Sequence, residues 1–188
     1  MSSPHLLLTG DRLALGMPRD EMLTEYHRWE TDPGTVLGRG GGFPQTWESR
    51  AEEWDRALDD RDHPCFEIVR LKDKQPIGLT SLRVDARERR AEFSILIAPA
   101  HRGRRLAEEA TRLTLDWSFH LGGLHTVWLR VLEPNRAGLT AFEKAGFRPT
   151  GRFRKSGHWL GQRVDEVLMD ALIEDFPGPS AMVTTLGR

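Results

Sequence analysis

The chain contains 188 residues, of which 38% are hydrophobic and 29% are charged, a balance typical of one globular domain with a sizeable core. Its formal net charge of −1 provides no global positive field that would recruit nucleic acid or an anionic membrane. A single cysteine excludes an internal disulfide framework, and no apolar run approaches the length of a membrane span. Because the N-terminus shows neither a basic leader nor a small-residue cleavage site, we expect a cytoplasmic protein.

The first part of the chain predicts one strand followed by two amphipathic helices. The strand is expected around residues 6–15. Met22, Tyr26 and Trp29 then recur at the spacing of one helical face. A second helix follows Thr46, which suits an N-cap. The apolar positions of this second helix are Trp47, Ala51, Trp54 and Leu58.

A glycine-rich segment, GRGGGF at residues 38–43, separates these two helices. Its composition suggests a phosphate-binding loop, but no strand precedes it and Pro44 delays the next helix, so we interpret it as a flexible loop. Three strand-like runs follow the second helix. They cover residues 65–71, 77–84 and 91–97, and the polar turns between them favour an antiparallel meander.

The second half of the chain changes from strand to helical periodicity after Arg104. The apolar face of this helix consists of Leu106, Ala110, Leu113 and Trp117, and two glycines end it. A strand over residues 127–131, a short helix that ends at Gly146, and a hairpin of residues 147–155 and 164–169 complete the pattern. This order alone supports an α+β (mixed α/β) sheet protein. We divide it into one domain over residues 1–174 and a flexible tail over residues 175–188.

A basic turn between the run Ile95–Ile97 and the helix after Arg104 carries the clearest chemical signal. A strand that enters a helix through such a turn presents unpaired backbone N–H groups, which form an anion site suited to a pyrophosphate. Arg102, Arg104 and Arg105 would add charge-assisted contacts to the anion. On this segment alone, a solvated basic turn that caps a core helix is an equal alternative.

Two segments together resemble the general N-acetyltransferase (GNAT) superfamily, and more closely its branch that acetylates protein N-termini, polyamines and antibiotics. The first segment is Arg102-Gly103-Arg104-Arg105-Leu106-Ala107, which is similar to the family's Gln/Arg-x-x-Gly-x-Gly/Ala loop. The second is Asn135-Arg136-Ala137 with Phe142-Glu143-Lys144-Ala145-Gly146-Phe147, which is similar to the family's Asn...Tyr-Glu-Lys-x-Gly-Phe segment. The resemblance covers residues 6 to 172. It implies a central, mostly antiparallel sheet that is splayed at the cofactor site and flanked by helices.

The resemblance implies acetyl-CoA, or another acyl-CoA, as co-substrate, and no metal. The backbone of Ile95, Leu96 and Ile97 would pair with the pantetheine arm, while residues 102 to 107 would hold the pyrophosphate. Such a slot requires the sheet to splay between this strand and the strand that ends at Val131, commonly by a bulge. Asn135 is expected to reach the pantetheine arm. Lys144 either approaches the cofactor phosphates or is a solvated residue of a helix face.

Amide formation requires a neutral amine, and it requires donors for the oxyanion that develops on the thioester carbonyl. A backbone N–H of the strand at residues 95–97 could be that donor. Glu92 matches a position where members of the family often place a general base, frequently one that acts through water. The alternative is that Glu92 merely pairs with Arg89 or Arg90 at the rim of the sheet.

Two residues depart from the family pattern. Arg105 occupies the position of the loop's second small residue, so its side chain must point away from the pyrophosphate or contact a cofactor phosphate itself. Phe142 stands where the family usually has a tyrosine that protonates the leaving thiolate. Water, Ser94 or Cys65 would have to replace that acid, with a rate loss of about 10- to 100-fold.

The sequence thus leads to two hypotheses. In the first, an acyl group passes directly from acyl-CoA to the primary amine of a small molecule or a protein N-terminus in a ternary complex. In the second, the chain is a CoA-binding sensor or interaction module without turnover. The acceptor is not identified, but loop 38–43 and Trp29, Trp47 and Trp159 are expected near its entrance. No nucleic acid or membrane partner is expected, and a homodimer is compatible with the sequence.

Overall fold

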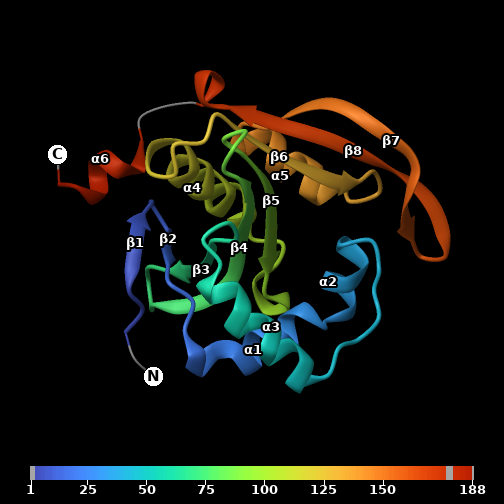
Figure 1. Ribbon diagram of the computed structural model, residues 1–188, viewed down its shortest axis with the longest axis horizontal. Coiled ribbons are helices and arrows are strands. Elements are labelled where there is room, and N and C mark those ends of the chain that lie inside the picture. Colours follow the sequence, from blue (N-terminus) through green and yellow to red (C-terminus); the bar gives the residue numbers. More distant parts are fainter. Residues whose placement is uncertain (1–2, 177–179, 188) are drawn as a thin grey trace.

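The computed structural model describes residues 3–176 and 180–187. Within these residues the strands form an eight-stranded sheet in the order β1-β2-β3-β4-β5-β6-β8-β7 (Figure 1). Neighbouring strands are antiparallel, except that β5 and β6 run parallel. The strands are β1 (Leu6–Thr9), β2 (Leu13–Gly16), β3 (Cys65–Arg70), β4 (Gln75–Asp85), β5 (Arg90–Ile97), β6 (Thr126–Leu132), β7 (Arg148–Trp159) and β8 (Gln162–Leu172). This mostly antiparallel sheet confirms the predicted fold class.

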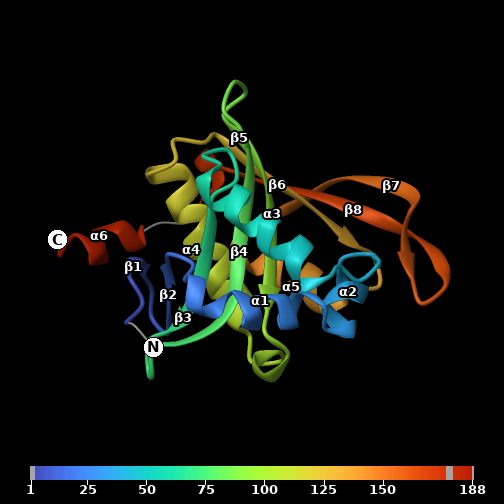
Figure 2. The same ribbon diagram turned by 60° about the horizontal axis from the view of Figure 1, so that its bottom comes forward.

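Helices cover both faces of the sheet (Figures 1 and 2). They are α1 (Leu23–Glu30), α2 (Pro33–Gly38), α3 (Trp47–Asp59), α4 (Leu106–His120), α5 (Arg136–Ala145) and α6 (Ala181–Thr185). The predicted caps are present, since the Thr46 side chain accepts a hydrogen bond from the amide of Ser49 and Gly146 ends α5 in the left-handed conformation. Among the described helices, none is long and apolar enough to cross a bilayer.

The alternation of side chains along β5 shows how the two faces are filled. Ala91 and Phe93 are buried in the larger core, which contains residues of α4 and α5. Leu96, at the other face, packs with Tyr26 of α1 and Trp54 of α3 in a second core. The strand therefore separates a face covered by α4 and α5 from a face covered by α1 and α3.

Two predicted elements have different bounds in the structure. The opening strand is a hairpin of β1 and β2, because the turn-forming residues Gly10 and Asp11 interrupt the leucine-rich run, and the Gly10 amide bonds to the Leu13 carbonyl at 2.8 Å. Helix α2 lies in a segment where no helix was expected. Its start is set by the Asp32 side chain, which accepts a hydrogen bond from the amide of Thr35, and by a proline in the first turn.

The C-terminal segment contains a short helix, α6, which lies against β1 and α4. Asp116 of α4 accepts hydrogen bonds from the Ser180 hydroxyl, at 2.5 Å, and from the amide of Ala181. Residues 177–179 and 188, and the side chain of Leu58 in the predicted face of α3, lie outside the described part of the chain. The division into one domain over residues 1–174 and a flexible tail stays a prediction.

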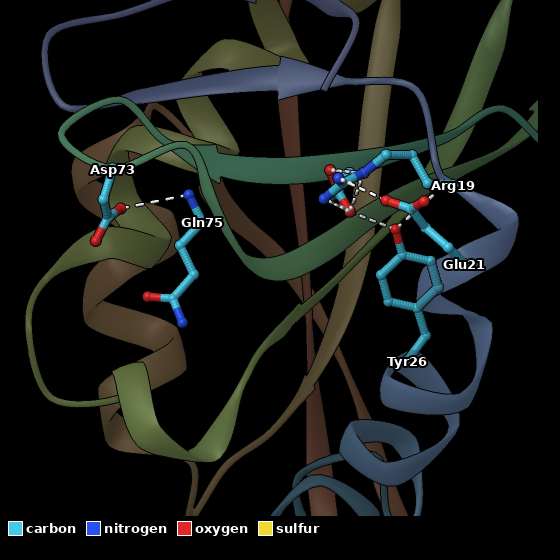
Figure 3. A network of polar contacts seen from close by, with 6 residues as sticks. Arg19, Glu21, Tyr26, Asp73 and Gln75 are labelled. Carbon is cyan, nitrogen blue, oxygen red and sulfur yellow. Dashed lines mark hydrogen bonds and ion pairs between the residues drawn. The ribbon is translucent and has the colours of Figure 1, made fainter. Parts of the chain in front are cut away.

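A buried ion pair anchors the N-terminal helices to the sheet (Figure 3). The Glu67 side chain of β3 is fully buried, and its Oε1 lies 3.1 Å from Nη2 of Arg19. The Tyr26 hydroxyl of α1 donates a second hydrogen bond to this carboxylate. Burial and the neighbouring Glu67 charge raise the pKa of Tyr26, so the phenol remains a proton donor. The position of α1 over the sheet is therefore fixed by a fully buried carboxylate.

Candidate active site

Strands β5 and β6 pair over only three residues and then diverge. Their register runs from Arg90 opposite Thr126 to Glu92 opposite Trp128. Beyond that point β6 continues beside β8, whereas residues 93–97 of β5 have no described partner on this side (Figure 2). The predicted splay of the sheet is therefore confirmed. No bulge interrupts the pairing of β4 with β5, because their register is continuous from Gly78 opposite Ile97 to Asp85 opposite Arg90. The slot therefore opens because β6 turns away from β5.

A cavity of about 920 Å³ occupies this slot. The predicted site residues all line it: Glu92, Ser94, Ile95, Leu96, Ile97, Arg102, Gly103, Arg104, Arg105, Leu106, Ala107, Asn135, Phe142 and Lys144. The fold thus brings together two sequence segments that are about thirty residues apart. A second cavity, of about 1330 Å³, lies between α1, the β3–β4 turn and residues 98–101, and it lacks the open strand edge. We therefore regard the slot as the candidate active site.

The turn that precedes α4 exposes backbone N–H groups. Gly103 and Arg105 both have positive φ angles, of 74° and 56°, and Arg105 is the N-cap of α4 without a side-chain capping bond. The first amides of this 15-residue helix therefore have no side-chain acceptor. Arg12 holds the turn from behind, because its Nη2 donates to the Arg105 carbonyl at 3.2 Å. This geometry can receive an anion at the helix N-terminus.

The side chain of Arg102 does not point to that anion site. Its Nη1 lies 2.8 Å from Oδ2 of Asp32, its Nη2 donates to the Thr35 hydroxyl at 2.5 Å, and its Nε donates to the Ile97 carbonyl at 3.2 Å. Partial burial raises the pKa of Asp32, but the contacts with Arg102 and Thr35 outweigh this effect and lower it. Arg102 therefore joins α2 to the end of β5, and the expectation that its guanidinium contacts the pyrophosphate is not met by this geometry.

The other two arginines of the turn remain exposed. Within the described part of the chain, the guanidinium groups of Arg104 and Arg105 make no hydrogen bond or ion pair. Their charges are therefore available to an anion. Lys144, on α5, is also exposed. That position is compatible with contact to the cofactor phosphates and also with a solvated residue of a helix face.

The residues expected to face the reacting end have defined partners. Asn135 is the N-cap of α5, and its Oδ1 accepts a hydrogen bond from the Gly138 amide at 3.0 Å. Phe142 is only 9% exposed and packs edge-on against Phe93, with ring centroids 6.2 Å apart. Phe142 thus contributes apolar surface and no proton donor to the slot.

Glu92 is ion-paired, although with other arginines than the sequence suggested. Its Oε1 lies 3.1 Å from Nη2 of Arg130, and its Oε2 forms a short contact with Nη2 of Arg83. The nearby Arg89 instead bonds to a backbone carbonyl, and Arg90 pairs with an aspartate of β4. Both carboxylate oxygens of Glu92 are therefore engaged, although each oxygen keeps a lone pair that can accept a further hydrogen bond.

Two groups were considered as replacements for the missing tyrosine. The Ser94 hydroxyl lines the cavity and lies 2.7 Å from the Ser81 hydroxyl. Burial, with a smaller contribution from the Glu30 charge, raises the pKa of the Cys65 thiol to about 12. A thiol with that pKa is a weak proton donor at neutral pH, and Cys65 is not among the residues that line the cavity. Ser94 and water remain as candidates.

The opposite wall of the cavity contains charged residues that the sequence did not single out. Arg39 follows α2, and Glu166 lies on the face of β8 opposite the buried Val167. Arg39 belongs to the glycine-rich loop of residues 38–43, so this loop could have pointed to Arg39 as a residue of the cavity. Glu166 had no motif to mark it. Of the three tryptophans expected here, Trp159 lines the cavity, whereas the other two lie elsewhere, on α1 and at the start of α3.

The chain was compared with known proteins once this geometry was established. A family model described as "Acetyltransferase (GNAT) domain" matches residues 12–148. The spermidine N(1)-acetyltransferase of Escherichia coli K12 is 34% identical over 117 residues, which cover 62% of this chain and 62% of that protein. The corresponding enzyme of Vibrio cholerae is 31% identical over 108 residues, or 62% of its length. The probable N-acetyltransferase YjcK of Bacillus subtilis is 30% identical over 125 residues, or 69% of its length.

A solved structure of the Vibrio cholerae spermidine N-acetyltransferase, in complex with CoA and spermine, has the same fold. Its TM-score is 0.83 over 89% of this chain and 99% of that chain, at 24% sequence identity. The family match covers well over half of the sequence and includes both β5 and the turn before α4. This chain therefore belongs to the acetyltransferase (GNAT) domain family.

Proposed function

We propose that this protein is an acetyl-CoA-dependent N-acetyltransferase that modifies a primary amine in a single ternary complex. The observation that carries the proposal is one cavity in which the open edge of β5, at residues 93–97, leads to the uncapped N-terminus of α4. An extended thioester arm and a diphosphate need these two features in this order. Membership of the GNAT family supports the same activity.

Cofactor binding is assigned to the wall formed by β5, α4 and α5. The backbone of Ile95–Ile97 pairs with the pantetheine arm, and the amides of residues 103–107 bind the pyrophosphate. Arg104 and Arg105, which have no ion pair among the described residues, contact phosphate oxygens. The Asn135 side chain, whose Oδ1 caps α5, offers its Nδ2 to the arm.

The chemical step consists of attack by the neutral amine on the thioester carbonyl. The C–N bond forms, the C–S bond breaks, and a backbone N–H of β5 donates to the oxyanion. Glu92 accepts the amine proton through a water molecule, at a lone pair that its two arginine contacts leave free. The thiolate leaves and takes a proton from water or Ser94, since Phe142 has no acidic proton to give.

The relatives suggest which amines should be tried first. Two of them are named spermidine N(1)-acetyltransferases, so a polyamine belongs in any panel of acceptors together with amino acids, short peptides and amino sugars. Because each of these alignments spans 62% of the relative's length, their substrate is a candidate for this chain and nothing more.

Release of free thiol from acetyl-CoA across this panel tests the proposal. We expect turnover with at least one amine, and Glu92→Gln should lower kcat by about 10²-fold because the water-mediated base is lost. Arg83→Gln is the matched control, since it breaks the same ion pair and keeps the carboxylate. If Arg83→Gln lowered kcat as strongly as Glu92→Gln, loss of the pair and not of the base would explain the effect.

One specific observation favours the second candidate, a CoA-binding sensor. Phe142 occupies the position of the usual acid and packs into the core, and both oxygens of Glu92 are held by arginines. Thiol release with the amine panel, together with calorimetry of CoA binding, separates the two candidates. A sensor would bind CoA tightly, release no thiol with any amine, and be unaffected by Glu92→Gln.

A further inference from the structure

Glu92, which lines the slot, and two acids at the end of α1 and the start of α2, which do not line it, are already paired with arginines. Glu30 lies 2.6 Å from Arg50, and Asp32 lies 2.8 Å from Arg102. Glu92 contacts two further arginines of β4 and β6. A polycationic acceptor would have to displace these guanidinium groups to reach the carboxylates, and each displacement leaves a positive charge without its partner.

On the acceptor side of the cavity, away from the turn before α4, two charged lining residues are not ion-paired. The Arg39 guanidinium makes no hydrogen bond or ion pair with any described residue. Glu166 accepts a hydrogen bond from the Ser156 hydroxyl at 2.8 Å but has no cationic partner in the described part of the chain. In a region where other charges are neutralised by neighbours, this pair of opposite, unused charges is suited to a ligand that carries both signs.

Glu166 and the backbone next to Arg39 border the same leucine at the floor of the acceptor side. Leu132 of β6 lies directly opposite Glu166 of β8 in the sheet register. From the other side, a Cβ atom placed on Gly40 would lie 3.9 Å from the Leu132 side chain, so the backbone next to Arg39 reaches this leucine. Arg39 and Glu166 therefore belong to facing walls of one chamber, with an apolar floor between them.

The surroundings of Arg39 favour a bound anion. Partial burial lowers the pKa of Arg39, the charge of Glu30 raises it, and the neighbouring Arg50 lowers it. Glu30 is itself neutralised by the 2.6 Å contact with Arg50. Arg39 is exposed and lines the cavity, so a carboxylate can form two parallel hydrogen bonds with its guanidinium.

We propose that the acceptor is an amino-carboxylic acid, whose carboxylate binds Arg39 and whose amino group is attracted to the side of Glu166. The inference rests on the proposed acyl transfer and names its substrate class. It separates this chain from the relatives named for spermidine, since spermidine carries no anionic group for Arg39.

The test compares matched pairs of acceptors. The twenty common amino acids, β-alanine and 4-aminobutyrate are assayed by thiol release, each beside its carboxamide, with spermidine as a reference. We expect at least one acid to exceed its amide by 10-fold or more in kcat/KM. Arg39→Gln should abolish this preference by raising KM for the acid, with no change in KM for acetyl-CoA, while Arg39→Lys retains part of it.

Arg87→Gln is the control variant, since Arg87 is exposed on the β4–β5 turn and does not line the cavity. Higher kcat/KM for spermidine than for every acid would overturn the inference and leave the acyl transfer intact. So would an equal loss for acid and amide in Arg39→Gln.

If no amine releases thiol, the proposed function fails, and the inference is then decided by binding. Calorimetric titration of the CoA-saturated protein with the same acids should show binding that Arg39→Gln removes. Absence of such binding in the unchanged protein would overturn the inference as well.

Discussion

The two walls of the cavity are assembled in different ways. The cofactor wall consists of β5, the turn after it and α4, which are continuous in sequence, together with the start of α5. The acceptor wall combines residues of α2, the following loop, β7 and β8, which lie far apart along the chain. Local sequence order builds the first wall, whereas only the folded topology builds the second.

The walls also differ in the groups that they present. The cofactor wall offers backbone amides of a strand edge and of a helix N-terminus, which almost any sequence can supply once the turn has formed. The acceptor wall offers side-chain charges such as Arg39 and Glu166. We infer that the first wall sets the reaction class, and the second wall sets which amine is used.

The largest expected effect concerns the anchor of the acceptor side. Glu67→Gln should lower the free energy of unfolding by about 3–5 kcal/mol, because the largely buried Arg19 guanidinium would lose the fully buried one of its carboxylate partners. Urea denaturation measures this loss. The control is Glu21→Gln, which removes a more exposed carboxylate, at 39% side-chain exposure, from the same arginine and should cost under about 1 kcal/mol. Equal losses in both variants would contradict a special role of the buried pair.

The cofactor wall is expected to be sensitive at Gly78 of β4. A Cβ atom at this position would lie 2.2 Å from the Leu96 carbonyl oxygen and 3.2 Å from Cα of Ile97, both of them backbone atoms of β5. Gly78→Ala should therefore destabilise the fold by about 1–3 kcal/mol and weaken acetyl-CoA binding, because the end of β5 must shift. Denaturation and calorimetry measure the two effects.

Gly38→Ala is the matched control on the acceptor side. A Cβ atom on Gly38 would meet no heavy atom within 4 Å, so we expect unchanged stability and unchanged acetyl-CoA affinity. Weakened cofactor binding in Gly38→Ala, but not in Gly78→Ala, would reverse the assignment of the two walls.

The fold was predictable where side chains alternate between core and solvent. Helix α4 and strand β6 show clear periodicity and were found close to their observed bounds. Helix α2 has six residues, two of them glycine, and carries no apolar period. The side chains of β7 are almost all exposed, so its sequence gives no alternation that would mark its full length.

The site was predictable as a set of positions and not as a set of contacts. Every candidate site residue lines the cavity, because the motifs that contain most of them are local segments. The partners of these residues come from distant elements: Asp32 binds Arg102, and Arg83 binds Glu92. Such pairings depend on sheet register and on the packing of α2, which no local pattern encodes.

A pH titration of stability probes the packing around Cys65 of β3, which does not line the cavity. Burial raises the pKa of Cys65 from 9.0 to about 12, so the unfolded chain loses the thiol proton at lower pH than the folded chain. The resulting contribution of Cys65 to the free energy of unfolding is fully present below pH 9 and is lost as the pH rises from 9 to 12. At pH 10 the loss should be about 1.4 kcal/mol.

Cys65→Ser should lack the pH-dependent loss of stability that comes from the thiol and should retain any loss that comes from Tyr26. The difference between the titrations of the unchanged protein and of Cys65→Ser therefore isolates the thiol. Denaturation at pH 8 and pH 10 gives the comparison. Identical pH dependence in both proteins would mean that the thiol titrates normally in the folded state and that water reaches Cys65.

The smallest expected effect returns to the cofactor wall, at Arg105. Its φ of 56° lies in the left-handed region, which costs an L-residue about 1–2 kcal/mol but costs glycine little. Part of this gain is cancelled by the greater freedom of glycine in the unfolded chain, so Arg105→Gly should stabilise the fold by about 0.5–1 kcal/mol. If the exposed guanidinium contacts a phosphate, the same change weakens acetyl-CoA binding several-fold. The control variant Arg105→Asn removes the charge but keeps a side chain that tolerates the left-handed conformation. It should bind acetyl-CoA as weakly as Arg105→Gly and be stabilised less. Tighter acetyl-CoA binding in both variants would mean that the arginine obstructs the diphosphate.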